Sequence, residues 1–152
     1  MTRKRDPFTV DLFSDLKPAP VVDRFDGEDV KAWSLAGRLA KAVARTMEAS
    51  GKSRDEIAAE MTEVTKTDVS KAMLDAYASQ AREKHSISAL RLAALAIVTG
   101  DARAFNTLLE EAGLIVVPQK YEALLRRERA RELRDQLERE EKAADAEWRA
   151  NR

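Results

Sequence analysis

The stretch SRDEIAAEMTEVTKTDVSKAMLDAYAS, from Ser53 to Ser79, predicts two short helices joined by a polar connection. Ser53 is a favoured N-cap residue and Glu56 follows three positions later, so the two can form a capping box that starts a helix at Arg54. This helix has only a narrow apolar stripe, and it therefore needs neighbours to stay folded. The stripe consists of Ile57, Ala58 and Met61.

The second helix of the stretch is predicted from Val69 to Ser79, after a connection from Thr62 to Asp68 whose β-branched residues disfavour helix. Either Thr67 or Asp68 can cap this helix. One of its faces is expected to be buried, because apolar residues recur there at spacings of three and four. These residues are Val69, Ala72, Met73, Ala76 and Tyr77. The opposite, solvent-facing side carries Ser70, Lys71, Leu74, Asp75 and Ser79.

Composition limits what the rest of the chain can be. Of its 152 residues, 44% are hydrophobic, 36% are charged and only 5% are aromatic, which indicates an all-α protein with long solvated faces. The 27 basic and 27 acidic residues cancel, so any affinity for nucleic acid must come from a local patch. Cysteine is absent, which excludes disulfides, and no run approaches the ~20 apolar residues of a membrane span. We therefore expect a cytoplasmic protein without a membrane partner.

Three regions are expected along the chain: a flexible arm over residues 1–25, a globular domain over residues 26–117 and a charged helix over residues 118–152. The basic tip of the arm, Arg3-Lys4-Arg5, either reaches a DNA groove or is a solvated terminus. The apolar pieces of the arm either dock on a partner or strap across the protein's own core. These pieces are Phe8, Val10, Leu12 and Phe13, followed by Val21, Val22 and Phe25.

The globular domain is predicted to contain five helices, of which the stretch quoted above supplies the second and third. The first begins with the acidic Asp26 to Asp29, continues to Met47 and ends at Ser50-Gly51. Its apolar stripe includes Trp33, and a tryptophan in that position is expected in the core.

The fourth and fifth helices close the domain. The fourth is capped by Ser86 or Ser88 and stopped by Gly100, and its stripe is the most apolar in the sequence. That stripe consists of Ile87, Leu90, Ala94, Leu95 and Val98. The fifth is capped by Asp101 and closed by Gly113, with Phe105, Leu108, Leu109 and Ala112 facing inward.

The residues after the globular domain fall into two parts. Leu114 to Val117 is a short β-branched run, expected to form one strand that pairs with a second copy or with the arm. Pro118 to Arg152 lacks glycine and interleaves ten basic with nine acidic residues, which predicts a long helix with i,i+4 ion pairs. Its apolar stripe, Ala130, Leu133, Leu137 and Ala144, leaves three roles open: a solvated helix, a weak dimer or a helix that binds a partner.

Catalytic and metal-binding chemistry finds no support in the sequence. His85 is the only histidine, and no cysteine accompanies it, so a zinc site is not expected. No nucleophile with a neighbouring base and no glycine-rich phosphate loop is recognisable, so neither an enzyme nor a cofactor is expected. The loop around His85 also carries Arg82 and Lys84, which are candidates for contacts with phosphate.

The order of elements resembles the lambda-repressor/Cro-like family of helix-turn-helix domains: a supporting helix, S-x-x-E-I-A-x-x-M, a connection, V-S-x-x-M-L and two closing helices. The resemblance covers Trp33 to Gly113 and implies that Val69 to Ser79 enters the major groove of DNA. It implies that Lys66, Thr67, Ser70, Lys71 and Leu74 or Asp75 face the DNA. Two departures stand out: the connection is longer than the family's tight glycine turn, and Asp75 is acidic.

This resemblance leads to the functional hypothesis of a sequence-specific double-stranded DNA-binding protein that regulates transcription. A homodimer formed through Leu114 to Trp148 is expected, because one module usually reads too short a site. Such a fold with zero net charge also resembles small phage-encoded or prophage-encoded regulators. The alternative is a protein-interaction adaptor that keeps the fold without DNA binding and meets its partners through the arm or the C-terminal helix. The zero net charge and Asp75 favour this alternative, whereas Lys66, Lys71, Arg82 and Lys84 favour DNA binding.

Overall fold

A computed structural model describes residues 20–80 and 85–151 of the chain, and the expectations for the arm's tip and its first apolar piece lie outside these residues. The described residues include six α-helices and short 3-10 segments and contain no strand, which confirms the all-α class. The chain divides into two compact units, Met1–Val116 and Val117–Arg152. In the described ranges, no helix is long and apolar enough to cross a membrane.

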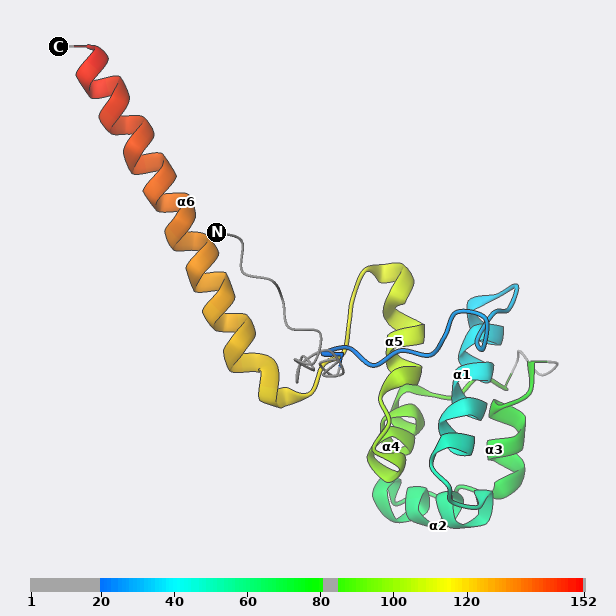
Figure 1. Ribbon diagram of the computed structural model, residues 1–152. Helices are drawn as coiled ribbons and strands as arrows, with labels where there is room; N and C mark the ends of the chain where they lie inside the picture. The colour runs from blue at the N-terminus through cyan, green and yellow to red at the C-terminus, as the bar shows by residue number, and fades with distance from the viewer. Residues whose placement is uncertain (1–19, 81–84, 152) are drawn as a thin grey trace, which may run out of the picture. The chain divides into compact units, whose positions relative to one another are not determined.

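The first unit contains five α-helices: α1 (Leu35–Ala49), α2 (Arg54–Thr65), α3 (Lys71–Tyr77), α4 (Ala89–Thr99) and α5 (Arg103–Leu109). The 3-10 helix η2 (Glu110–Ala112) extends α5. In Figure 1, α1 stands beside α5 and packs against it, α2 packs against α4, and α3 contacts both α1 and α2. The second unit contains the 3-10 helix η3 (Gln119–Tyr121) and α6 (Glu122–Ala150).

Serine side chains cap four of the helices in the first unit. Ser34, Ser53, Ser70 and Ser88 each accept a hydrogen bond from a backbone N–H of the first turn, which satisfies a donor that the helix itself leaves free. At α2 the predicted capping box is present: Glu56 N donates to Ser53 Oγ over 3.2 Å, and Ser53 N donates to Glu56 Oε2 over 2.7 Å. At α4 the cap is Ser88 rather than Ser86, and Gly100 ends the helix in the left-handed conformation, as predicted.

The beginning of α1 differs from the prediction, which placed it at Asp26. The helix starts only at Leu35, after the Ser34 cap, and residues 26–30 form turns instead. Trp33 therefore precedes the helix and is fully exposed, with 104% relative accessibility, so its predicted place in the core was wrong. The core position is taken by Val30, which is buried, and by Phe25, which packs on the core beneath the Arg103 guanidinium.

The core of the first unit is built by all five helices and by Val30, Val69 and Ile87 from the segments between them. Leu95 of α4 is fully buried, as predicted, whereas Leu90 is exposed and Leu92 takes the expected inward place. Because Ser88 is the cap, Leu90 lies in the first turn of α4, and its side chain is exposed to solvent. The buried apolar residues with the largest side chains and almost no exposure are Ile57, Met61, Leu74, Leu92, Leu95 and Val43.

The beginning and inward face of α5 also differ from the prediction. Asp101 is not the N-cap, which is Ala102, but its carboxylate accepts from Arg103 N over 2.9 Å and pairs with the Arg103 guanidinium. This ion pair raises the already high pKa of Arg103. Ala112 is exposed, Phe105 and Leu108 are half-buried against the core, and the buried residues of α5 are Ala104, Asn106 and Thr107.

In the described residues the run Leu114 to Val117 forms no strand, and its predicted partners, a second copy and the arm's first apolar piece, lie outside these residues. Buried Asn106 satisfies the backbone of Val116 instead: Asn106 Oδ1 accepts from Val116 N over 2.6 Å, and Asn106 Nδ2 donates to Val116 O over 3.2 Å. The same Nδ2 donates to Asp23 O over 2.9 Å. One buried side chain thus satisfies both backbone polar groups of Val116.

In the second unit, the predicted long helix is present as α6. None of its residues is buried within the described structure. Ion pairs one turn apart join Arg126 to Glu122 and Arg134 to Glu138, both at 3.8 Å, and Arg149 to Asp145 at 3.6 Å. Because an isolated helix of this length needs such local support, the charges and the absence of breakers account for its continuity.

Candidate nucleic-acid interface

The connection between α2 and α3 is shorter than the sequence suggested. α2 continues to Thr65, and Lys66 ends it with φ 55°, the left-handed conformation that a glycine usually supplies. The connection is therefore only Lys66 to Ser70, and the predicted long connection from Thr62 to Asp68 was wrong. The reason is that Thr62 and Thr65 turn their hydroxyls to the backbone and remain compatible with the helix.

Threonine hydroxyls and one buried valine hold this connection in place. Thr62 Oγ1 accepts from Val69 N over 2.9 Å, and Thr65 Oγ1 donates to Met61 O over 2.9 Å. Thr67 Oγ1 lies 3.0 Å from Thr65 Oγ1. Val69 is buried in the core, so the connection is anchored on both its backbone and its side chains.

The face of α3 agrees with the prediction at Val69, Ala76 and Tyr77, which are buried, and differs at Leu74 and Ala72. Leu74 is fully buried and cannot face DNA, so its place among the candidate DNA contacts was wrong. The helix starts at Lys71 because Ser70, not Thr67 or Asp68, is its cap. Leu74 faces inward beside Ala76 and Tyr77, and Ala72 faces outward, although the sequence pattern had assigned Ala72 to the core.

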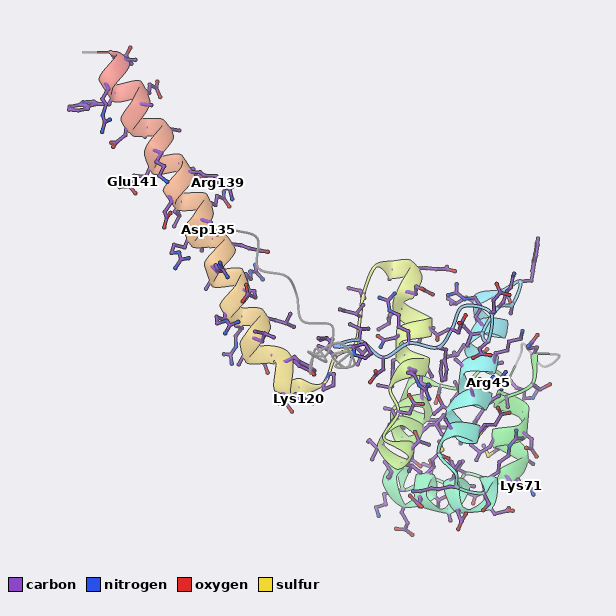
Figure 2. All side chains as sticks on the ribbon, viewed as in Figure 1. Arg45, Lys71, Lys120, Asp135, Arg139 and Glu141 are labelled. Carbon is purple, nitrogen blue, oxygen red and sulfur yellow. The ribbon has the colours of Figure 1, made fainter. Side chains whose placement is uncertain are left out.

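The other candidate residues fall into two groups. Lys66, Thr67, Lys71 and Asp75 are exposed, and Figure 2 shows Lys71 at the periphery of the first unit. Ser70 is half-buried and its Oγ accepts from Met73 N over 3.3 Å, so its oxygen serves the cap of α3. Arg82 and Lys84 lie outside the described residues, and His85, at the edge of that gap, is exposed.

Acidic side chains accompany the cations of this surface. Lys71 Nζ lies 3.4 Å from Asp55 Oδ2, and Lys66 Nζ lies 3.4 Å from Glu63 Oε2. Arg54 of α2 pairs with Asp75 of α3. All these side chains are substantially exposed, so each pair contributes little to stability and can open at small cost.

The surface around α2 and α3 carries more acidic than basic residues, despite the exposed Lys66 and Lys71. From Lys52 to Asp75 the sequence contains four basic and six acidic residues. Among the acids, Glu56 has its pKa lowered, first by the hydrogen bond from the Ser53 hydroxyl and then by that from the Ser53 backbone. It is therefore ionised at neutral pH. The local potential over this face has no strong positive bias toward phosphate.

The described residues contain no group of three or more histidine, cysteine or acidic side chains that could hold a metal ion. A hollow between the 24–32 segment and α5 is lined by Arg24, Phe25, Arg38, Asn106 and Glu110. Arg38 there pairs with Glu110 and with Glu111, the latter at 2.8 Å, so its cation is already matched by two carboxylates.

Comparison with known proteins gave no matching family model, no matching curated protein and no matching solved structure.

Proposed function

We propose that the first unit is a helix-turn-helix domain of the lambda-repressor type and that α3 reads base edges in the major groove of duplex DNA. The observation that carries the proposal is the set of outward side chains on α3, Lys71, Ala72 and Asp75, presented by a connection that is anchored in the core. The protein would be a binding protein without catalytic chemistry, and regulation of transcription is the role such a module most directly serves.

The three outward side chains suit three different base edges. A lysine donates to O6 and N7 of guanine, an alanine methyl group packs against the methyl group of thymine, and an aspartate accepts from N4 of cytosine. Asp75, which weighed against DNA in the sequence, is thus consistent with base recognition. Opening its pair with Arg54 also frees a cation near the DNA backbone.

The charge distribution implies that few phosphates are contacted. Lys66 and Arg54 are the cations nearest to such a role, and Thr67 offers a neutral hydroxyl beside them. Since each phosphate contact contributes ~0.9 to the slope of log affinity against log salt, we expect a slope of only about 2–3 for the first unit. Affinity should depend strongly on the base sequence and weakly on salt.

The experiment is a selection of bound sequences from a random duplex pool at low salt, followed by salt titration on the enriched duplex. Lys71→Ala should weaken binding to the enriched duplex about tenfold and flatten the slope by at most one contact. Asp75→Asn should change the preferred base at one position. Lys142→Ala, an exposed lysine on α6, is the matched control and should bind like the wild type. Equal binding by Lys71→Ala and wild type, or no enrichment, would contradict the proposal.

A protein-interaction adaptor on the same fold is the second candidate. The observation in its favour is that Lys66, Lys71 and Arg54 each have an acidic partner within the unit and that acids outnumber bases around them. The same selection distinguishes the two, because an adaptor should enrich no duplex sequence. Its partners would meet the arm or α6.

A further inference from the structure

The second unit presents an apolar stripe with nothing against it in the described part of that unit. Leu133 and Leu137 are each 56% exposed, and Ala130 and Ala144 lie on the same side of α6 one to two turns away. Leu124 and Leu125, equally apolar, lie on other sides of the helix. We propose that the stripe pairs with α6 of a second copy of the chain and that the two helices run antiparallel. This inference does not depend on DNA binding.

The stripe follows a seven-residue repeat with two inward positions per repeat. The first inward position is occupied by Ala123, Ala130, Leu137 and Ala144. The second is occupied by Arg126, Leu133, Glu140 and Glu147. Positions of these two kinds face the partner helix in a two-stranded coiled coil. Because charged residues occupy three of the second positions, the orientation of the partner decides whether pairing is tolerable.

A parallel pair is disfavoured by its own charges. In a parallel pair each inward residue meets its own copy, so Arg126 would face Arg126, Glu140 would face Glu140, and Glu147 would face Glu147. Three of the eight inward layers would then hold like charges. Like charges placed directly against each other are destabilising, and here they would be partly desolvated.

An antiparallel pair removes every one of these conflicts. First positions then face second positions, and a register centred between Leu133 and Leu137 sets each leucine against the other in two central layers. In the same register each charged inward residue meets a small alanine, past which its side chain can reach solvent. These layers pair Arg126 with Ala144, Glu140 with Ala130, and Glu147 with Ala123.

Beside the stripe, one pair of charges matches only in the antiparallel orientation, while Arg134 at the midpoint faces its own copy. Arg127 and Glu141 occupy equivalent flanking positions, and the register above places each beside the other in the partner helix, twice per dimer. The two halves of α6 differ in sign as well: Glu122 to Arg134 contains five basic and three acidic residues, and Asp135 to Ala150 contains six acidic and three basic. Figure 2 marks Asp135 and Glu141 within that acidic half. Each basic half therefore lies along an acidic half.

Distance measurement between spin labels in the full-length chain tests the orientation. The natural sequence has no cysteine, so Ala150→Cys introduces one attachment site per chain. In the antiparallel register, residue 150 lies opposite residue 120 of the other copy, and 30 residues at ~1.5 Å rise place the two labels about 45 Å apart. A parallel pair would hold them at the ~10 Å interaxial distance plus the reach of the labels. A short distance between the labels would overturn the proposal. So would the absence of any measurable label–label distance up to about 100 μM protein, because it would mean that no dimer forms.

Matched variants test the stripe and the register. Leu133→Ala with Leu137→Ala should weaken dimerisation at least about tenfold in sedimentation, whereas Leu124→Ala with Leu125→Ala should not change it. Both doubles keep good helix formers, so α6 remains helical. Arg127→Glu and Glu141→Arg should each weaken the dimer several-fold, and the double exchange should restore it. Loss of dimer in the control double, or no rescue in the double exchange, would contradict this register.

Discussion

The two units of this protein reach the helical state by different means. In the first unit the helices are 7 to 15 residues long and share a core of 18 buried hydrophobic residues, all between Val30 and Ala104. In the second unit α6 has 29 residues and none is buried. Short helices are marginal in water, so α1 to α5 depend on their mutual packing, whereas α6 depends on length and local ion pairs. Stability of the fold should therefore reside almost wholly in the first unit.

The most severe test of this difference removes one leucine from each unit. Leu95 is fully buried at the centre of the first unit, so Leu95→Ala should lower the free energy of unfolding by about 2–5 kcal/mol. Leu125 is 54% exposed on α6 and off the dimer stripe, so Leu125→Ala should cost less than about 0.5 kcal/mol. Urea unfolding followed by circular dichroism measures both. Equal losses of unfolding free energy in the two variants would mean that the two units do not differ in how much they depend on buried side chains.

The next largest effect concerns a carboxamide in each unit. Asn106→Ala should cost about 1–3 kcal/mol, because it leaves backbone groups at Asp23 and Val116 without their buried partner. The control is Gln136→Ala on α6, where the amide donates to Glu140 over 3.0 Å in full exposure. That variant should be within about 0.5 kcal/mol of the wild type in the same unfolding experiment.

Helix caps give a smaller contrast, since Ser53 caps α2 with its side chain and α6 has no side-chain cap. Ser53→Ala should cost about 1 kcal/mol at neutral pH. The hydrogen bonds from Ser53 lower the pKa of Glu56 below its ordinary 4.5, so their contribution is fully present above that value and is lost as the pH falls through the lowered pKa. The difference in the free energy of unfolding between Ser53→Ala and the wild type should therefore become smaller at acidic pH. A gap that widens below pH ~4 would contradict the capping box.

The smallest expected effect is a gain in stability. Lys66 ends α2 at φ 55°, so Lys66→Gly should stabilise the first unit by about 0.5–1 kcal/mol. The reciprocal control is Gly100→Ala, at φ +70° with nothing within 4 Å of the added carbon, which should destabilise by about 1 kcal/mol through backbone strain alone. Thermal unfolding compares the two. A loss of stability in Lys66→Gly would show that the lysine side chain matters more than its backbone.

Features that depend on a few neighbouring residues could be predicted from the sequence. The Ser53–Glu56 capping box, the stop at Gly100 and the continuous α6 all follow from local backbone chemistry and local charge. The faces of short helices could not, because a shift of the cap by two or three residues rotates which side chains point inward. Trp33 lies outside the core because α1 begins only at Leu35, and Leu92 is buried in place of Leu90 because Ser88 caps α4 and leaves Leu90 in its exposed first turn.

The candidate interface on α3 was also only partly predictable from the sequence. Lys71 and Asp75 lie outward as the sequence pattern indicated, but Leu74 is buried and Ala72 takes an outward place. Recognising Ser70 as the cap would have set this register, since its oxygen meets Met73 N. The pairing of Lys71 with Asp55, and of Asp75 with Arg54, joins residues 16 and 21 positions apart. Such contacts require the packing of α2 on α3 and carry no signal in the sequence alone.

The amide of Asn106 brings together two points that are far apart in the chain. Its single nitrogen lies 2.9 Å from Asp23 O and 3.2 Å from Val116 O, so these two points of the backbone lie side by side. A few glycines could join these points without disturbing the core. The helices could then be circularly permuted, with new termini opened in the exposed turn at Gly51 between α1 and α2. In such a variant α2 would be synthesised first and α1 last, while the arrangement of the five helices in space would stay the same.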